Sequence, residues 1–178
     1  DLPINSYENE DSAIANSKRL VQAGAHAVKL EGGKEVAKII KAVKDSGIPV
    51  MGHLGLLPQT AEKYSVQAKK SEDAISLIED SKILEESGVF SIVLEMVTSD
   101  VTEIITKSVK IPIIGIGGIS CIEDVIEFIL AGASLVQIGT LNYTNPNIGV
   151  EIVNGLKQYC SKNNVNLLDI VGQIKYDK

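Results

Sequence analysis

The feature that most limits the fold of this chain is a regular alternation of short apolar runs and longer amphipathic segments. Each run is rich in Val, Ile and Leu, lies between turn-forming residues and is too short to be a helix. The segments between the runs place apolar side chains on one helical face, as Val36, Ile40 and Val43 do. This alternation is typical of β-α units around a parallel sheet. The predicted strands are 25–30, 48–52, 89–94, 111–116 and 134–138.

Five predicted strands leave two architectures open, a five-stranded open α/β sheet and part of a (β/α)8 barrel. A closed barrel needs eight strands and typically about 250 residues, whereas this chain has 178. The opening residues, Asp1 to Pro3, resemble the end of a strand already in progress. We therefore expect an α/β fold, a partial (β/α)8 TIM barrel of about five β-α units with parallel strands. No linker divides residues 1–178, which predicts a single partial-barrel domain.

The two edge strands of such a sheet are unpaired, and this predicts how the protein associates with other chains. An unpaired edge strand presents free backbone groups that invite pairing with another chain. We therefore expect a homo-oligomer. A small-molecule substrate is the other partner expected, because the polar residues of the chain gather at predicted strand ends.

Composition argues against several other classes of protein. The chain has 17 Lys and Arg against 23 Asp and Glu, a net charge of −6, which disfavours a nucleic-acid partner. No apolar run approaches the roughly 20 residues of a membrane-spanning helix, so no membrane partner is expected. Cys121 and Cys160 are far apart and form no C-x-x-C pair, which excludes a disulfide framework and a cysteine-based zinc site. This cysteine usage predicts a cytoplasmic location.

Polar side chains stand at the predicted carboxyl ends of the first three strands, where α/β folds bind their ligands. Lys29 and Glu31 fall on one face by period-two alternation, and either serve a site or form a buried ion pair at the rim. His53 follows the second strand in a glycine-flanked turn and is either structural or catalytic. Glu95 ends the third strand and is either a general base or a carboxylate facing solvent.

Two glycine turns follow the last two predicted strands. Gly117 and Gly118 precede one helix, and Gly139 and Thr140 precede another. Backbone N–H groups and helix ends at such turns can bind an anion, and the last two β-α turns are the usual phosphate site of a barrel. Tight β-α turns also need glycine, so phosphate binding and a purely structural role both stay open.

Five stretches in the first two thirds of the chain follow the pattern of one family. They are DLPINSY (1–7), AGAHAVKLEGG (23–33), GIPVMGHLGLLPQ (47–59), YSVQAKK (64–70) and GVFSIVLEMV (88–97). Residues 1 to about 112 thereby resemble ketopantoate hydroxymethyltransferase, also called 3-methyl-2-oxobutanoate hydroxymethyltransferase. The resemblance implies a (β/α)8 barrel in pantothenate biosynthesis. It also implies transfer of a one-carbon unit from 5,10-methylenetetrahydrofolate to a 2-oxo acid, with Mg2+.

Transferred residue by residue, this resemblance assigns a role to each strand-end side chain. It makes Asp1 a metal ligand and Glu31 a carboxylate that holds Mg2+ through water. Lys29 would contact the carboxylate of the substrate, His53 would lie beside the substrate, and Glu95 would act as the base. The chemistry is coherent, because Mg2+ prefers oxygen ligands and a chelated 2-oxo acid has an acidic neighbouring C–H bond. The chain lacks the early Gly-Asp-Ser stretch that supplies a further metal-binding aspartate in the family.

The last third of the chain resembles a different family. The stretch IPIIGIGGISCIEDVIEFILAGASLVQIGTLNYTNP (111–146) and the tail LLDIVGQIK (167–175) are similar to the end of dihydroorotate dehydrogenase. That family is also a (β/α)8 barrel, and it binds FMN with the phosphate in the last two β-α turns. The resemblance places the phosphate contacts on the backbone at Gly117, Gly118, Gly139 and Thr140. It implies two alternatives, an FMN-dependent fragment or a chimeric scaffold that binds phosphate without turnover.

Overall fold

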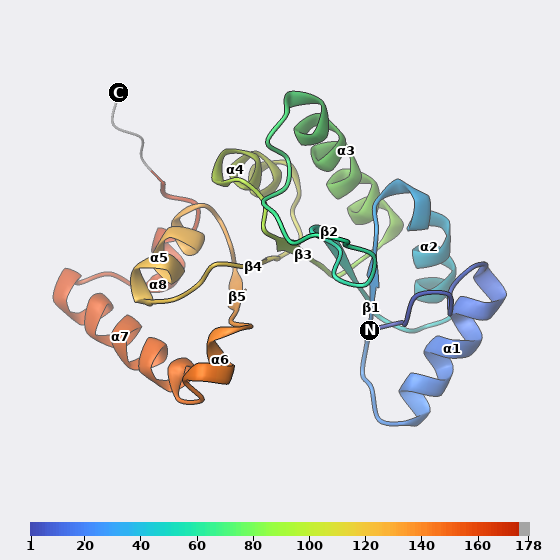
Figure 1. Ribbon diagram of the computed structural model, residues 1–178, viewed down its shortest axis with the longest axis horizontal. Helices are drawn as coiled ribbons and strands as arrows, with labels where there is room; N and C mark the ends of the chain where they lie inside the picture. The colour runs from blue at the N-terminus through green and yellow to red at the C-terminus, as the bar shows by residue number, and fades with distance from the viewer. Residues whose placement is uncertain (175–178) are drawn as a thin grey trace.

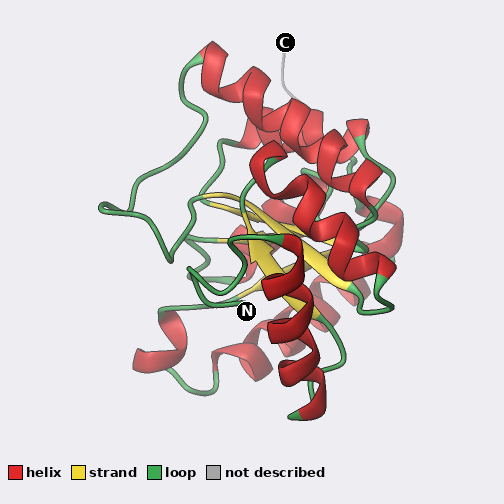
Figure 2. Cartoon of the chain, turned by 90° about the vertical axis from the view of Figure 1, so that its right-hand side faces the viewer, coloured by secondary structure: helices red, strands yellow, loops and turns green. Residues whose placement is uncertain are grey.

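The computed structural model describes residues 1–174 and is built on one sheet of five parallel strands. The strand order is β1-β2-β3-β4-β5, so strands that follow one another along the chain are also neighbours in the sheet. Each pair is joined by a crossover that carries helix, as parallel strands require. Figure 1 shows these helices along the outside of the sheet, and Figure 2 shows the strands enclosed by them. The strands are β1 (Val28–Glu31), β2 (Val50–Gly55), β3 (Ser91–Glu95), β4 (Ile113–Ile116) and β5 (Leu135–Gln137).

The helices follow the predicted alternation with the strands. The first begins after Asn9, whose side-chain oxygen accepts a hydrogen bond from the backbone N–H of Ser12 at 2.9 Å, as an N-cap does. A 3-10 turn, η1, precedes α2, and the short helix α6 follows β5 directly. The helical elements are α1 (Glu10–Gln22), η1 (Lys34–Val36), α2 (Ala37–Asp45), α3 (Ser71–Ser87), α4 (Ser99–Ser108), α5 (Ile122–Leu130), α6 (Leu141–Thr144), α7 (Ile148–Asn163) and α8 (Leu167–Ile170).

All five predicted strands are confirmed, although the bounds of each differ from the prediction, most of all in the first two. The first was expected from residue 25, but the backbone N–H of Ala25 donates to the carbonyl of Leu20 and so still closes the end of α1. The second extends to Gly55, because its pairing with β3 continues to Glu95. His53 therefore lies inside a strand, and its predicted place in a turn was wrong.

Two clusters of buried apolar side chains hold the described residues together. The larger cluster extends from Leu2 to Ile113 and fills the space between β1–β4 and the helices α1–α4. The smaller cluster begins at Ile119 and includes Ile152 of α7. The core is therefore divided between Ile113 and Ile119.

The two edges of the sheet differ. Beside β1, the N–H of Leu2 donates to the carbonyl of Lys29 at 3.0 Å, and Leu2 is fully buried. At the other edge, β5 leaves Leu135 61% exposed. The single sheet of five parallel strands and its outer helices confirm the predicted α/β partial-barrel architecture. Residues 175–178, which include the end of the 167–175 stretch, lie outside the described part of the chain.

Candidate active site

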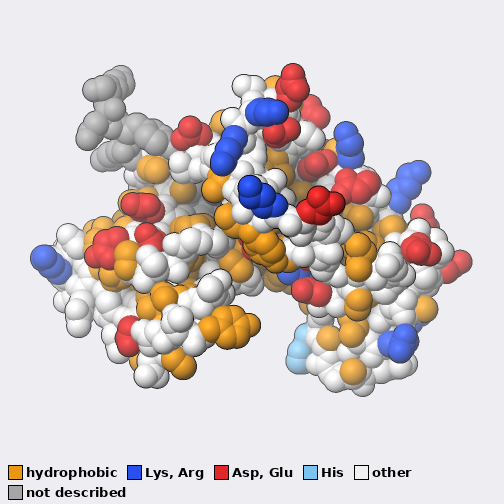
Figure 3. Space-filling view, viewed as in Figure 1, with side chains coloured by type: hydrophobic (Ala, Val, Ile, Leu, Met, Phe, Trp, Pro, Cys, Tyr) orange, Lys and Arg blue, Asp and Glu red, His pale blue; other side chains and the backbone are white. Residues whose placement is uncertain are grey.

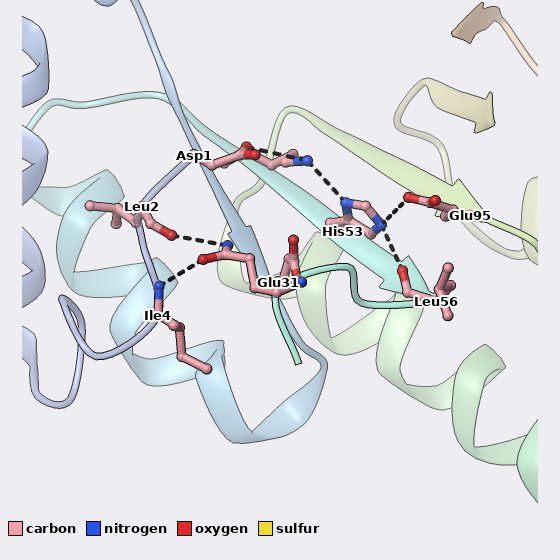
Figure 4. A network of polar contacts seen from close by, with 9 residues as sticks. Asp1, Leu2, Ile4, Glu31, His53, Leu56 and Glu95 are labelled. Carbon is pink, nitrogen blue, oxygen red and sulfur yellow. Dashed lines mark hydrogen bonds and ion pairs between the residues drawn. The ribbon is translucent and has the colours of Figure 1, made fainter. Parts of the chain in front are cut away.

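Three neighbouring strands bring the predicted site residues to one end of the sheet. Glu31 of β1 is paired in register with His53 of β2, and Glu95 of β3 is paired with Gly55. Figure 4 shows the side chain of Glu95 pointing toward His53. Glycine is required at position 55, because its φ is +89° and a Cβ there would stand 2.3 Å from the carbonyl oxygen of Glu95.

The imidazole of His53 is held in one neutral tautomer. The Nζ atom of Lys29 lies 3.1 Å from Nδ1 of His53. An ammonium group can only donate, so Nδ1 accepts and the ring proton is on Nε2. Nε2–H then donates to the carbonyl of Leu56 at 2.9 Å. Burial, reinforced by the charge of Lys29, lowers the pKa of His53 from 6.5 to about 4.

The carboxyl group of Glu95 has the properties of a general base. Its Oε2 lies 3.3 Å from Nε2 of His53, and the side chain is 13% exposed. That distance suits an ion pair, but His53 is neutral and its Nε2 proton is directed to Leu56, so the two groups are in polar contact without an ion pair. Burial raises the pKa of Glu95 above its ordinary 4.5; the charge of Lys29 opposes this shift and that of Glu31 adds to it. A raised pKa makes a carboxylate a stronger proton acceptor.

The two predicted metal ligands occupy different surroundings. Asp1 is half exposed, and its Oδ1 lies 3.2 Å from Nζ of Lys29. Lys29 therefore forms its ion pair with Asp1, not with Glu31. Glu31 is 6% exposed, and its Oε2 accepts a hydrogen bond from the backbone N–H of Gln59 at 3.1 Å.

Gln59 connects the chain segments in this part of the site, and the sequence did not predict this role. Its side-chain oxygen accepts from the N–H of Ile4 at 2.7 Å, and its side-chain nitrogen donates to the carbonyl of Leu2 at 3.2 Å. Together with its contact to Glu31, Gln59 ties the segment that carries Asp1 to the end of β1. The available signal was its position at the end of the stretch GIPVMGHLGLLPQ.

A cavity of about 380 Å³ adjoins Glu95. Gly117, Gly118, Gly139 and Thr140 all line it, so the structure brings the four residues predicted to bind phosphate to one place beside the predicted base. Asp1, Lys29, Glu31 and His53 do not line this cavity. The polar cluster around His53 and this cavity thus meet at Glu95. The phosphate role of the four residues stays a prediction.

The oxygen atoms available in this site determine which metal ion could bind there. Within residues 1–174, no group of three or more His, Cys, Asp and Glu side chains is arranged to hold a metal ion. Asp1 and Glu31 supply carboxylate oxygens, and Mg2+ is commonly bound by one or two carboxylates together with substrate and waters. Glu31 uses one carboxylate oxygen on Gln59, which leaves the other for a metal-bound water. The donor type therefore fits Mg2+.

Comparison with known proteins identifies the family of the chain. The family model described as ketopantoate hydroxymethyltransferase matches residues 1–137, which include every member of the strand-end cluster. The chain belongs to the ketopantoate hydroxymethyltransferase family. A 3-methyl-2-oxobutanoate hydroxymethyltransferase of Nitrosopumilus maritimus is 53% identical over 126 residues, covering 68% of this chain and 45% of the relative. One of Cenarchaeum symbiosum is 56% identical, with 68% and 48% covered. This hydroxymethyltransferase-family chain spans about half the length of the curated relatives it matches.

Solved structures support the fold alone. A BexX/CysO complex of Amycolatopsis orientalis has a TM-score of 0.53 at 16% identity, covering 74% of this chain and 53% of that one. FabK of Thermotoga maritima has a TM-score of 0.52 at 19% identity, covering 77% and 39%. The family match runs to the end of β5 and overlaps the stretch 111–146. The resemblance of that stretch to dihydroorotate dehydrogenase, and FMN binding with it, stay predictions.

Within residues 1–174, no helix is both long enough and apolar enough to cross a bilayer.

Proposed function

We propose that this chain performs the enolisation chemistry of 3-methyl-2-oxobutanoate hydroxymethyltransferase in pantothenate biosynthesis. The observation that carries the proposal is the position of Glu95, a carboxyl group of raised pKa that contacts a neutral imidazole. The family membership and the placement of Lys29 near this pair support a small 2-oxo acid as the substrate.

Each side chain has a distinct task in the proposed reaction. Lys29 binds the carboxylate of the 2-oxo acid, because an ammonium group that is partly withdrawn from water attracts an anion strongly. His53, which stays neutral, lies beside the substrate and donates its Nε2 proton to the carbonyl of Leu56, which holds the ring next to Glu95. Glu95 removes the proton from the carbon next to the carbonyl group, which leaves an enolate.

The second half of the reaction uses the one-carbon donor. The electron pair of the enolate forms a carbon–carbon bond to the methylene carbon of 5,10-methylenetetrahydrofolate. Both carbon–nitrogen bonds of that methylene group break, one as the new carbon–carbon bond forms and the other as the oxygen of water bonds to the carbon and becomes the hydroxyl group. The electron pairs stay on the two nitrogens, which take up the proton removed by Glu95 and a proton from water. The donor leaves as tetrahydrofolate, so no oxidant or reductant is needed.

Asp1 and Glu31 would hold Mg2+ on the substrate side of Glu95. Bound there, the ion would polarise the substrate carbonyl group and make the neighbouring C–H bond more acidic. Lys29 now neutralises Asp1 at 3.2 Å, so metal binding requires Asp1 to change partner. Gln59 keeps Glu31 oriented in either state.

We also infer that residues 1–178 act as one partial-barrel domain. Pairing of β4 with β5 continues the sheet across the division between the two core clusters, and the cavity is lined from both sides of that division. The proposed enolisation residues Lys29, His53 and Glu95, in contrast, lie on β1, β2 and β3, which pack in the first cluster.

The direct test is exchange of deuterium from heavy water into 3-methyl-2-oxobutanoate, followed by proton NMR with Mg2+ present. Glu95→Gln should slow exchange by a factor of about 100 or more, the usual contribution of a positioned base. Glu86→Gln changes an exposed carboxylate of α3 in the same way and should leave the rate unchanged. Equal exchange by the wild type and Glu95→Gln would exclude the proposed role of Glu95.

A further inference from the structure

The residue that follows the proposed base has an unusual backbone. Met96 comes directly after Glu95, the last residue of β3, and its φ is +51°. That angle lies in the left-handed region, which a residue with a Cβ adopts only at a cost. In the described part of the chain, the other positive φ values outside glycine belong to Asn5, Asn164 and Ala68. Asparagine tolerates this region, so the strained positions among these are Met96 and Ala68.

Three hydrogen bonds to three different segments hold the backbone at this point. The N–H of Leu56 donates to the carbonyl of Glu95 at 2.8 Å. The N–H of Met96 donates to the carbonyl of Ile116 at 3.1 Å, and the carbonyl of Met96 accepts from the N–H of Gln67 at 2.7 Å. The first two bonds fix the peptide group between Glu95 and Met96 from both sides. A strained backbone persists only where its surroundings determine it in this way.

The loop between β2 and α3 is attached to the end of β3 at the same place. Gln67 of this loop forms an isolated parallel bridge with Val97, the residue after Met96. Ala68, the second strained residue, follows Gln67 directly. Both strained residues therefore belong to one junction. Strain on both sides of a contact indicates that the contact, and not local preference, sets the backbone there.

Gly117 leaves the space that the side chain of Met96 occupies. A Cβ at position 117 would stand 2.8 Å from Cγ of Met96 and 3.3 Å from its backbone nitrogen. Met96 also lines the cavity beside Glu95. The turn at Met96 is thus packed from the side of β4 as well as held by hydrogen bonds.

A change of φ at Met96 would act on the base. Rotation about this bond moves the chain on one side of it relative to the other. It must therefore either break the contact with Gln67 or turn the peptide group that follows Glu95. Turning that group moves the side chain of Glu95, whose Oε2 lies 3.3 Å from Nε2 of His53. A displacement of about 1 Å at a reacting group can lower a rate by about a hundredfold.

We propose that Met96 is a positioning residue, whose left-handed backbone fixes the carboxyl group of Glu95 beside His53. The inference rests on the proposed function, in which Glu95 is the base. The site then requires residue 96 to tolerate a positive φ, and the chemistry of its side chain is secondary. Lys29, which binds the acid in the proposed reaction, is on β1, two strands away from this turn.

Two isomeric side chains test the proposal. Leucine and isoleucine contain the same atoms, but isoleucine is branched at Cβ and fits a positive φ poorly. Met96→Leu should keep the kcat of deuterium exchange, whereas Met96→Ile should lower it by about ten- to a hundredfold. KM should not change, because Lys29 still binds the acid. Rates are compared per folded molecule, at a temperature where circular dichroism shows both variants folded.

A second pair of variants applies if Met96→Ile does not fold. Met96→Asn and Met96→Thr both introduce small polar side chains. Asparagine tolerates a positive φ, and threonine, which is branched at Cβ, does not. Met96→Asn should be the faster of the two by about the same factor, and equal rates would contradict the role of the backbone.

Histidine NMR reports the geometry without catalysis. The chain has two histidines. His53 lies in the site, and His26 is exposed just before β1, at the other end of the sheet. Met96→Ile should shift the imidazole nitrogen signals of His53 relative to Met96→Leu, because the carboxyl group of Glu95 moves relative to Nε2. The signals of His26 should be the same in both variants.

The outcomes separate this inference from the proposed function. Equal kcat in Met96→Leu and Met96→Ile, with the His53 signals unchanged, overturns the inference and leaves Glu95 as the base. An equal loss in both variants also overturns it, since the methionine side chain would then be the requirement. Absence of exchange in the wild type contradicts the proposed function, whereas a His53 shift confined to Met96→Ile still supports the positioning of Glu95 by Met96.

Discussion

The part of the chain up to Ile113 and the part from Ile119 onward are packed in different ways. Among the described residues, eighteen buried apolar side chains form the first core cluster and five form the second. In the second part, Tyr143, Leu168 and Val150 are 91%, 80% and 64% exposed, more than any other large apolar side chain described. The space-filling view shows a hollow between two halves of the molecule at its lower edge (Figure 3).

The residues of the proposed enolisation site also belong to only one of these two parts. Every member of the proposed enolisation site is fixed by contacts within the first part, including the ion pair of Lys29 with Asp1 and the hydrogen bonds of Gln59. The second part contributes one wall of the cavity and no side chain of the charged cluster. A well-packed region thus holds the groups whose pKa values need a fixed environment. A less buried region borders the cavity.

Matched cavity-creating substitutions would give the largest difference between the two regions. Ile92→Ala should lower the free energy of unfolding by about 3–5 kcal/mol, because Ile92 is fully buried in the larger cluster. Ile152→Ala should cost about 2–3 kcal/mol in the smaller cluster. Urea denaturation measures both values, and Ile75→Ala, on an exposed isoleucine of α3, serves as the control. A larger loss for Ile152→Ala would reverse our ranking of the two regions.

Acid should destabilise the first region through His53. The folded state keeps His53 neutral down to about pH 4, whereas the unfolded chain takes up that proton near pH 6.5. The free energy of unfolding should therefore decrease as pH falls from 6.5 toward 4, by on the order of 1–3 kcal/mol from this group.

The comparison that isolates this contribution is wild type against His53→Gln. Glutamine can still donate to the carbonyl of Leu56 but does not titrate, so the variant should show a shallower acid dependence. Other carboxyl groups titrate in both proteins, and the raised pKa of Glu95 acts in the opposite direction. Denaturation curves at several pH values, with hydrogen exchange read separately for β1–β3 and for α5–α7, measure the effect. Parallel pH profiles for the two proteins would contradict the neutral state of His53.

The smallest effect on stability is expected at the open edge of the sheet. Leu135→Lys places a charge on an exposed position of β5 and should change the free energy of unfolding by less than about 0.5 kcal/mol. It should nevertheless reduce self-association, because charged side chains block edge-to-edge pairing. Sedimentation velocity at several concentrations measures this. A wild-type protein that stays monomeric throughout would show that the predicted homo-oligomer does not form through this edge.

The sequence alone determined the architecture and the candidate groups. Runs of β-branched residues between turns predict strands, and the period of two places Lys29 and Glu31 on one face whatever the rest of the chain does. Parallel strands end at the same edge of a sheet, so His53 and Glu95 were expected beside them. These properties are local or follow from strand direction, and they can be read without coordinates.

The tertiary structure alone decided how these groups interact. Lys29 meets Asp1 and His53 instead of Glu31, and the tautomer of His53 follows from that encounter. Gln59 acts on Leu2, 57 residues away, and the cavity forms only where β3, β4 and β5 lie side by side. Contacts of this kind depend on loop closure and on the distances between side chains from separate elements. No periodicity or propensity along the chain encodes those distances.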